Sequence, residues 1–316
     1  MNKPTHFTFL LLPEFTHIAF SCAIEPLRIA NLVSGRDLYR WTLVSEDGAS
    51  ATCSNGSVTL TNQGLVPTVK CDRIFVISGM NVQQHTSPGI LNWLRRERVA
   101  GTPLGGICSG AYVLAKAGFL DDLDTAVHWS WHDLFLEVFP DVQLVRSVFV
   151  AHEKIVTASG GTAAADLMLH LIAKDHGKTL ATEVADQMVY NAVREGSAPQ
   201  RVSLQSRYGM RNVHLVRAVE VMERSMETPL SPSMIAREVG ISTRQLERLF
   251  ARYLNATPKQ YFMEMRLHRA RNLLVQSEQS VTNIGLACGF QSTSHFSRMY
   301  RAQFGQTPVS QRSVLN

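Results

Sequence analysis

The stretch GFQSTSHFSRMYRAQFGQTP, residues 289–308, decides the fold of the last third of this chain. It opens with Gly289, a residue type that commonly ends helices because it takes a positive φ at little cost. Ser292 stands where a helix N-cap is expected. Phe296, Met299 and Tyr300 then follow at the i, i+3, i+4 spacing of a half-buried helix. Together with the short apolar segment before the glycine, this order predicts a helix-turn-helix unit.

A second copy of the pattern lies earlier in the chain, in IAREVGISTRQLERLFARYLNATP, residues 235–258. Pro258 matches Pro308 at an offset of 50 residues, whereas Gly240 matches Gly289 at an offset of 49. The later copy therefore has one extra residue in its turn. Two such units in tandem favour a DNA-reading module over the alternative, an ordinary repeat of helical hairpins.

The second helix of each copy has a polar, basic face opposite its apolar stripe. Such a helix can bury the stripe and offer the other face to the major groove of DNA. Arginine reads guanine in a bidentate way, glutamine reads adenine, and serine or threonine can serve a base or a phosphate. The polar faces comprise Thr243, Arg244, Gln245, Arg248 and Arg252 in the first copy, and Thr293, Ser294, His295, Arg298 and Arg301 in the second.

The net charge of +5 is divided unevenly along the chain. Residues 1–200 hold 15 Lys and Arg against 19 Asp and Glu, a balance of −4. Residues 201–316 hold 16 against 7, a balance of +9, and Lys259 is the one lysine among these 16. A basic module joined to a slightly acidic one indicates a polyanion-binding domain beside a domain with another role. Composition alone leaves a solvated charged surface as the alternative.

On these motifs, residues 213–313 resemble the AraC/XylS family of transcription regulators. The resemblance implies a seven-helix domain whose two recognition helices enter adjacent segments of the major groove of double-stranded DNA, with RNA polymerase as a further partner. It leaves His295 and Arg301 as candidate phosphate contacts. The family's base-reading positions fall on Arg244, Gln245, Arg248, Thr293, Ser294 and Arg298.

The first 190 residues instead alternate between strand-like and helix-like segments. This alternation predicts an α/β domain with a doubly wound, mostly parallel sheet, followed by the all-α domain with two helix-turn-helix motifs. The expected strands are 7–12, 39–45, 72–78, 103–108 and 154–160, and the expected helices are 22–33, 89–101, 109–120 and 162–177.

The clearest candidate for a reactive site in this half is GGICSGAYVLAKAGFLDD, residues 105–122. Cys108 lies between a buried strand and a helix start, as in a nucleophile elbow. A helix N-terminus at that place would lower the pKa of the thiol and favour an anion. His128, in TAVHWSW, is a candidate partner for a Cys–His dyad.

Residues 5–190 resemble class I glutamine amidotransferase-like domains of the PfpI branch, and more closely the sensor half of GlxA-like regulators. The elbow, the His-Trp pair and the segment 157–161 carry the resemblance. It implies a sensing and dimerising domain that binds a ligand without turnover, with carnitine, glycine betaine or arginine-type molecules as effectors. The sequence departs from hydrolytic relatives, because Ser109 replaces a histidine after the elbow and Ala19 occupies the place of a glutamate. We therefore expect no catalytic residue, although a thiol hydrolase or amidase with a DNA-binding tether is the alternative.

Ligands of open α/β sheets bind beyond the carboxyl ends of the strands. An aromatic wall beside Glu14 would suit a cationic amine or betaine through cation–π contact, although buried tryptophan is also common core material. Eight residues are the candidate ligand-binding set: Glu14, Phe15, Gly79, Met80, Cys108, Ser109, His128 and Trp129.

The organisation we expect is a sensing and dimerisation domain over 1–194, a linker over 195–212 and a DNA-binding domain over 213–316. The linker is rich in Ser, Gly, Pro and Arg. The five cysteines are scattered without metal-ligand spacing, so we expect reduced thiols, no metal and no cofactor in a cytoplasmic homodimer. No apolar run approaches the ~20 residues of a membrane helix. An architectural or RNA-binding protein is a third hypothesis.

Overall fold

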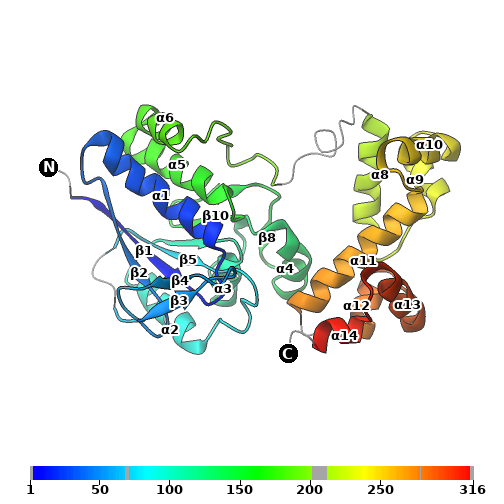
Figure 1. The fold of residues 1–316 in the computed structure, drawn as a ribbon, viewed down its shortest axis with the longest axis horizontal. Helices are drawn as coiled ribbons and strands as arrows, with labels where there is room; N and C mark the ends of the chain where they lie inside the picture. The colour runs from blue at the N-terminus through cyan, green and yellow to red at the C-terminus, as the bar shows by residue number, and fades with distance from the viewer. Residues whose placement is uncertain (1–2, 68–70, 201–211, 278, 314–316) are drawn as a thin grey trace. The chain divides into compact units, whose positions relative to one another are not determined.

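The computed structural model of this chain describes residues 3–67, 71–200, 212–277 and 279–313 (Figure 1). The chain divides into two compact units, Met1–Gln200 and Arg201–Asn316. Strands and helices alternate in the first unit, whereas the described part of the second unit is helical.

The first unit is built on a six-stranded sheet with the order β2-β1-β5-β6-β10-β9. All neighbours in this sheet are parallel except β10 and β9, which are antiparallel. Long apolar runs fit this arrangement, because a parallel sheet with helices on both faces buries both sides of its central strands. The strands are β1 (Thr5–Leu11), β2 (Tyr39–Val44), β5 (Arg73–Ile77), β6 (Leu104–Ile107), β9 (Phe149–Ala151) and β10 (Ile155–Ala158).

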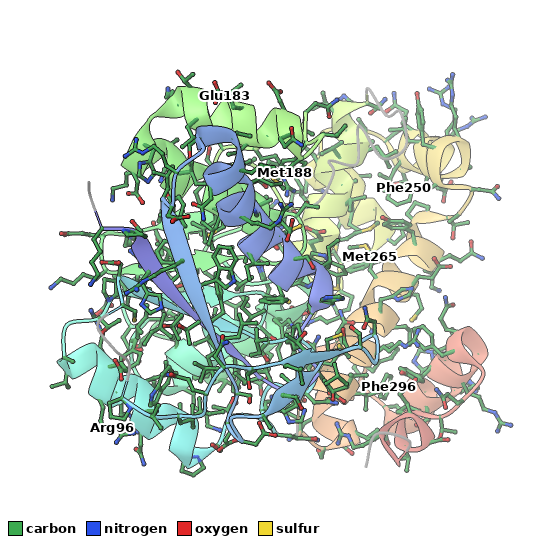
Figure 2. The ribbon with its side chains drawn as sticks, turned by 60° about the vertical axis from the view of Figure 1, so that its left-hand side comes forward. Arg96, Glu183, Met188, Phe250, Met265 and Phe296 are labelled. Atoms are coloured by element: carbon green, nitrogen blue, oxygen red, sulfur yellow. The ribbon has the colours of Figure 1, made fainter. Side chains whose placement is uncertain are left out.

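Helices cover both faces of this sheet, and the side chains of β1 alternate between the two resulting cores. Phe7 and Phe9 join one core, with residues of α1, α5 and α6, while Leu10 joins the other, with residues of α2, α3 and α4. Glu183 on α6 and Arg96 on α2 mark the two opposite sides in Figure 2. The helices are α1 (His17–Ser34), α2 (Pro88–Val99), α3 (Gly110–Lys116), α4 (His132–Val138), α5 (Ala163–His176) and α6 (Lys178–Gln187).

Smaller elements complete the first unit. β3 (Ser50–Thr52) and β4 (Val58–Leu60) form an antiparallel pair, while β7 (Asp124–Thr125) and β8 (Gln143–Leu144) form a short parallel pair. A single 3₁₀ turn, η1 (Trp129–Trp131), follows His128.

The predicted fold class, a mostly parallel α/β sheet followed by helices, is confirmed. Two helix bounds differ from the prediction. α1 begins at His17 rather than at residue 22, because Ala19 and Phe20 are buried on the same face as the rest of the helix. α3 ends at Lys116 rather than at residue 120, because Gly118 turns the chain at a φ of +80°.

The described part of the second unit contains seven helices, the number that the resemblance implies. Two apolar cores, one around each helix-turn-helix copy, hold them together. Phe250 belongs to the first core and Phe296 to the second (Figure 2). The helices are α8 (Val213–Arg224), α9 (Pro232–Glu238), α10 (Thr243–Leu254), α11 (Pro258–Gln276), α12 (Val281–Ala287), α13 (Thr293–Phe304) and α14 (Pro308–Ser313).

The long helix α11 links the two cores, because Phe262 packs in the first and Leu273 in the second. Its Arg266 is buried and donates to the carbonyl oxygens of Cys288 (2.7 Å) and Gly289 (2.8 Å), at the turn of the second copy. The guanidinium also lies 4.3 Å from the ring centre of Phe290. This arginine therefore stabilises the protein rather than a DNA complex.

The linker between the two units begins later in the chain than the sequence predicts. Residues 195–200 pack on the first unit, where Ala198 accepts from the Val148 amide (2.9 Å) and the Gln200 amide donates to Arg146 (3.3 Å). The first unit thus extends to Gln200 rather than to residue 194. Residues 201–211 of the predicted linker lie outside the described part of the chain. Among the helices that are described, none has the length and apolar character to span a membrane.

Candidate functional site

The two helix-turn-helix copies share their turn geometry. Gly240 and Gly289 follow α9 and α12 with φ values of +75° and +74°, in the left-handed region that only glycine enters freely. The turn between α12 and α13 is one residue longer than that between α9 and α10, as the offsets predict. Ser242 and Ser292 cap α10 and α13 by accepting the amides of Gln245 and His295.

The six predicted base-reading residues are all exposed along α10 and α13. The opposite sides of these helices hold Leu246, Phe250, Phe296 and Tyr300 in the two cores. Each of α10 and α13 therefore anchors an apolar stripe and leaves a polar face open, as a recognition helix must.

Gln245 has a structural task that the base-reading assignment did not consider. Its Oε1 accepts from the Ser242 amide (2.9 Å), which completes a capping box at the start of α10. A glutamine that reads adenine uses both its oxygen and its nitrogen. In this arrangement the side-chain amide nitrogen is the group left to donate to DNA. The S-x-x-Q spacing could have predicted this cap.

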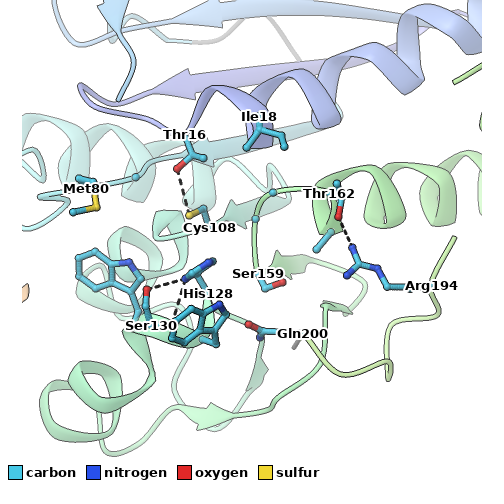
Figure 3. A pocket seen from close by; sticks show the side chains of 16 residues that line it. Thr16, Ile18, Met80, Cys108, His128, Ser130, Ser159, Thr162, Arg194 and Gln200 are labelled. Carbon is cyan, nitrogen blue, oxygen red and sulfur yellow. Dashed lines mark hydrogen bonds between the residues drawn. The ribbon is translucent and has the colours of Figure 1, made fainter. Parts of the chain in front are cut away.

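A pocket of about 350 Å³ opens in the first unit, beyond the carboxyl ends of β5, β6 and β10 (Figure 3). Segments that are far apart in the sequence meet there. The lining residues are Thr16, Ile18, Gly79, Met80, Cys108, His128, Trp129, Ser130, Trp131, Ser159, Gly160, Gly161, Thr162, Ala163, Arg194 and Gln200.

The elbow that carries Cys108 forms as predicted, directly between β6 and α3. Cys108 has a φ of +61°, a conformation that non-glycine residues rarely adopt without support. Its amide donates to the Ala158 carbonyl at the end of β10 (2.9 Å). Gly160 makes room for the elbow, since a Cβ there would lie 2.6 Å from the Cβ of Cys108.

The surroundings of the Cys108 thiol contradict the expectation of a lowered pKa. Burial raises the pKa of Cys108, and a hydrogen bond with the Thr16 hydroxyl (Sγ–Oγ1 3.6 Å) opposes that shift only in part. The positive end of the seven-residue helix α3 does not outweigh this desolvation. The thiol is therefore held in its neutral form, which is a poor nucleophile.

The orientation of His128 is a second observation against a Cys–His dyad. The Nδ1 atom of His128 lies 2.8 Å from the Ser130 hydroxyl, and within the described residues no hydrogen bond joins His128 to Cys108 (Figure 3). Burial, with a smaller contribution from the nearby His132, lowers the pKa of His128. The imidazole is therefore neutral at neutral pH and contributes an uncharged, aromatic wall to the pocket.

Five of the eight predicted ligand-binding residues line the pocket: Gly79, Met80, Cys108, His128 and Trp129. The other three do not line it. Phe15 is fully buried in a core. Glu14 accepts from the Asn81 side chain (2.8 Å), and the Ser109 hydroxyl donates to the carbonyl of Gly79 (2.6 Å).

The prediction missed four parts of the wall: Thr16 and Ile18 at the start of α1, Ser130 and Trp131 in η1, the loop Ser159–Ala163, and Arg194 with Gln200. The loop includes part of the segment 157–161 that carries the family resemblance, so the sequence held a signal for it. No local pattern marks Arg194 or Gln200, because tertiary packing brings them to the pocket.

Arg194 is fixed by a buried carboxylate. Its Nε lies 2.9 Å and its Nη2 2.7 Å from Oδ2 of Asp166, whose side chain is 0% exposed, and its own amide donates to Oδ1 (2.8 Å). Tyr190 donates its hydroxyl to the same carboxylate (3.0 Å). Nη2 also donates to the Thr162 hydroxyl (2.8 Å) at the start of α5. This pair holds a positive group at the pocket rim.

Clusters of three or more His, Cys, Asp or Glu side chains that could hold a metal ion do not occur within the described ranges of the chain.

Comparison with protein families gives one match for each unit. A helix-turn-helix domain family matches residues 235–313, and the DJ-1/PfpI family matches residues 8–174. The first match covers both exposed recognition faces, and the second covers the elbow and most of the pocket wall.

Several named regulators are similar to this chain over nearly their whole length. The HTH-type transcriptional regulator CdhR of Pseudomonas aeruginosa is 42% identical over 98% of this chain and 92% of its own length. GbdR of the same species is 38% identical over 98% and 85%, and GlxA of Rhizobium meliloti is 37% identical over 96% and 94%.

Solved structures agree with the fold of the first unit. An AraC family transcriptional regulator from Pseudomonas putida, 25% identical, matches 58% of this chain and all of its own with a TM-score of 0.53. DJ-1beta of Drosophila melanogaster, 21% identical, matches 59% of this chain and 98% of its own with a TM-score of 0.51, which shows a common fold.

Proposed function

Since this chain belongs to the AraC-type helix-turn-helix transcriptional regulators with an N-terminal DJ-1/PfpI domain, we propose that it is a ligand-responsive activator of a catabolic operon. It acts in the cytoplasm as a homodimer, with RNA polymerase as its partner at the promoter. The first unit binds a small amine, betaine or amino-acid metabolite, and the second unit binds the operator.

One observation supports sequence-specific DNA binding above the others, namely the pair of exposed polar faces on α10 and α13. Arg248 and Arg298 occupy equivalent places on these faces, at an offset of 50 residues. Both are exposed, and a buried apolar stripe fixes each helix behind them. Arginines held in this way can reach guanine edges in the major groove.

The effector class rests on the pocket wall. Trp129 is 43% exposed, and its ring centre lies 5.3 Å from that of His128. Two neutral aromatic groups at a rim suit a cationic headgroup through cation–π attraction. A volume of about 350 Å³ fits a small metabolite.

The footprint of the full-length protein on duplexes selected from a random library tests this function. We expect each subunit to protect two major-groove segments about one helical turn apart, with affinity that falls steeply as salt rises. A protein that protects no duplex, or that prefers single-stranded RNA, would be an architectural or RNA-binding protein instead.

The positive φ of Cys108 favours one second candidate, a thiol hydrolase or amidase with a DNA tether. Replacement of Cys108 by alanine separates the two functions. A regulator keeps effector-dependent transcription, with an altered affinity for the effector because Cys108 lines the pocket, since binding requires no reactive thiol. A hydrolase would lose both a measurable turnover and the response.

A further inference from the structure

The last residues of the first unit are also part of the pocket wall. Residues 194–200, which we call the exit segment, end at the boundary after Gln200, and Arg201 begins the second unit. Arg194 and Gln200, the two ends of this segment, both line the pocket (Figure 3). The exit segment therefore borders the cavity and continues directly into the chain of the DNA-binding unit.

Arg194 offers the pocket a donor that the protein itself does not use. Asp166 and Thr162 occupy its Nε and Nη2, whereas Nη1 makes no hydrogen bond with any described residue. The Arg194 side chain is 30% exposed and lines the pocket, which leaves this donor for a ligand. The N-terminus of α5, a helix of 14 residues, lies beside this side chain, and Asp166 in the first turn of that helix offsets part of the positive charge of Arg194. An anionic group, such as a carboxylate, is the complement of this arrangement.

Gln200 offers an acceptor that is also unused. Its Nε2 donates to the carbonyl oxygens of Val127 and Ser147, both at 2.9 Å. Because a carbonyl cannot donate, this pairing fixes the orientation of the amide and directs Oε1 away from both oxygens. Oε1 is buried and has no hydrogen-bond partner among the described residues. An unpaired buried acceptor is costly, so a donor from a bound molecule that reaches Oε1 through a shift of the Gln200 side chain would stabilise this position.

Between these two residues, backbone pairing and the packing of Gly196 on Phe149 and of Ala198 on the core hold the exit segment. It lies along residues 146–149, with an isolated antiparallel bridge between Ser147 and Pro199. Its backbone hydrogen bonds to this strip are Val148 to Ala198 and Gln200 to Arg146. Segments at the edge of a folded unit open locally at a lower free energy than its core, and a bound ligand changes that opening.

We propose that the exit segment senses the effector by binding it directly. Arg194 Nη1 donates to an anionic group of the molecule, Gln200 Oε1 accepts from an N–H or O–H of the same molecule, and these contacts fix residues 194–200. The effect of a bound molecule is then transmitted to the DNA-binding unit through the chain that follows Gln200. The inference rests on the proposed function and names the parts of the chain that would carry its regulation.

The test uses full-length protein and two matched pairs of probes, L-carnitine with choline and L-arginine with agmatine, all of which carry an O–H or N–H donor. The second member of each pair lacks the carboxylate. We expect a carboxylate-bearing probe to bind at least 10-fold more tightly than its partner and to slow amide hydrogen exchange at 195–200. Arg194→Lys keeps a cation beside Asp166 but loses the free guanidinium donors, so it should weaken that probe roughly 10- to 100-fold. Arg28→Lys, in the exposed pair with Glu25 outside the pocket, is the matched control and should bind as the parent does.

Three results would overturn the inference: equal binding of both members of each pair, binding without a change of exchange at 195–200, or no binding of any probe. The comparison of probes on the parent protein needs no variant, so an unfolded Arg194→Lys would not obscure the answer. Salt-dependent binding of duplex DNA, measured on the same preparations, reports on the regulator function separately. A protein that binds DNA but fails the probe test keeps its proposed function and loses this mechanism.

Discussion

The pocket of the first unit and the exposed polar faces of α10 and α13 in the second, which we call the reading faces, are built in opposite ways. The pocket collects residues from Thr16 to Gln200, and its elbow at Cys108 is buried and held in place by segments that are distant in the sequence. Each reading face comes from one short helix, and its side chains project into solvent from a frame that local sequence defines. A substitution in the pocket should therefore cost stability, whereas a substitution on a reading face should cost affinity for DNA and little else.

The largest effect is expected at Gly160. Alanine there would have to adopt a φ of +91° with its Cβ 2.6 Å from that of Cys108, so we expect Gly160→Ala to lower the stability of the first unit by about 3–5 kcal/mol. The neighbouring Gly161 has a φ of +55° but nothing within 4 Å of an added Cβ, so Gly161→Ala should cost only about 1–2 kcal/mol. Urea unfolding of both variants measures the difference, and equal losses would show that the elbow is not tightly packed.

Arg298→Ala is the contrasting change on a reading face. We expect a loss of about 1–3 kcal/mol in DNA affinity that relaxes preference at one base position. Because the side chain is exposed, the unfolding midpoint should stay within about 0.5 kcal/mol of the parent. Arg301→Ala is the control for a phosphate contact, with an equal loss on every sequence. Binding to a set of single-base operator variants tells them apart, and a uniform loss for Arg298→Ala would make that residue a phosphate contact too.

Gln245 both stabilises the protein, as a cap of α10, and lies on a face expected to contact DNA. Its replacement therefore tests whether the two roles can be separated. Gln245→Glu keeps the acceptor of the capping box but removes the side-chain donor and adds a negative charge beside DNA. Stability should stay within about 0.5 kcal/mol, while DNA affinity falls by about 1 kcal/mol or more. Gln260→Glu changes the equivalent capping box of α11 and is the control. Unchanged DNA binding by Gln245→Glu would leave the residue a cap alone.

The smallest effect concerns pH. Burial lowers the pKa of His128 in the folded protein, so the unfolded chain takes up a proton first as the pH falls. The first unit should therefore lose stability as the pH drops through about 6.5, the ordinary value for histidine, towards the folded pKa. His128→Gln should make this fall shallower without removing it, because the pKa of His132 is lowered in the same way. Urea midpoints from pH 8 to pH 5 measure the slope, and a steeper slope in the variant would contradict the sign.

The sequence predicted the second unit in detail because its signals are local. Glycine at a positive φ, a serine cap and an i, i+3, i+4 stripe all act within one turn of the residues that carry them. The one-residue difference between the two turns is readable from the offsets of Gly240 and Gly289. The S-x-x-Q spacing could also have predicted the capping role of Gln245, but the sequence analysis assigned this residue to base reading alone.

For the first unit, the sequence predicts the elements but only part of the pocket. By itself, the sequence determined the alternating elements, the elbow at Cys108 and five of the pocket residues, because a buried strand followed by a small-residue helix start has few other conformations. Only the tertiary structure decided that the thiol is neutral, that His128 turns to Ser130, and that Arg194 and Gln200 reach the pocket. Desolvation and long-range contacts depend on which segments pack together, and no spacing along the chain records that.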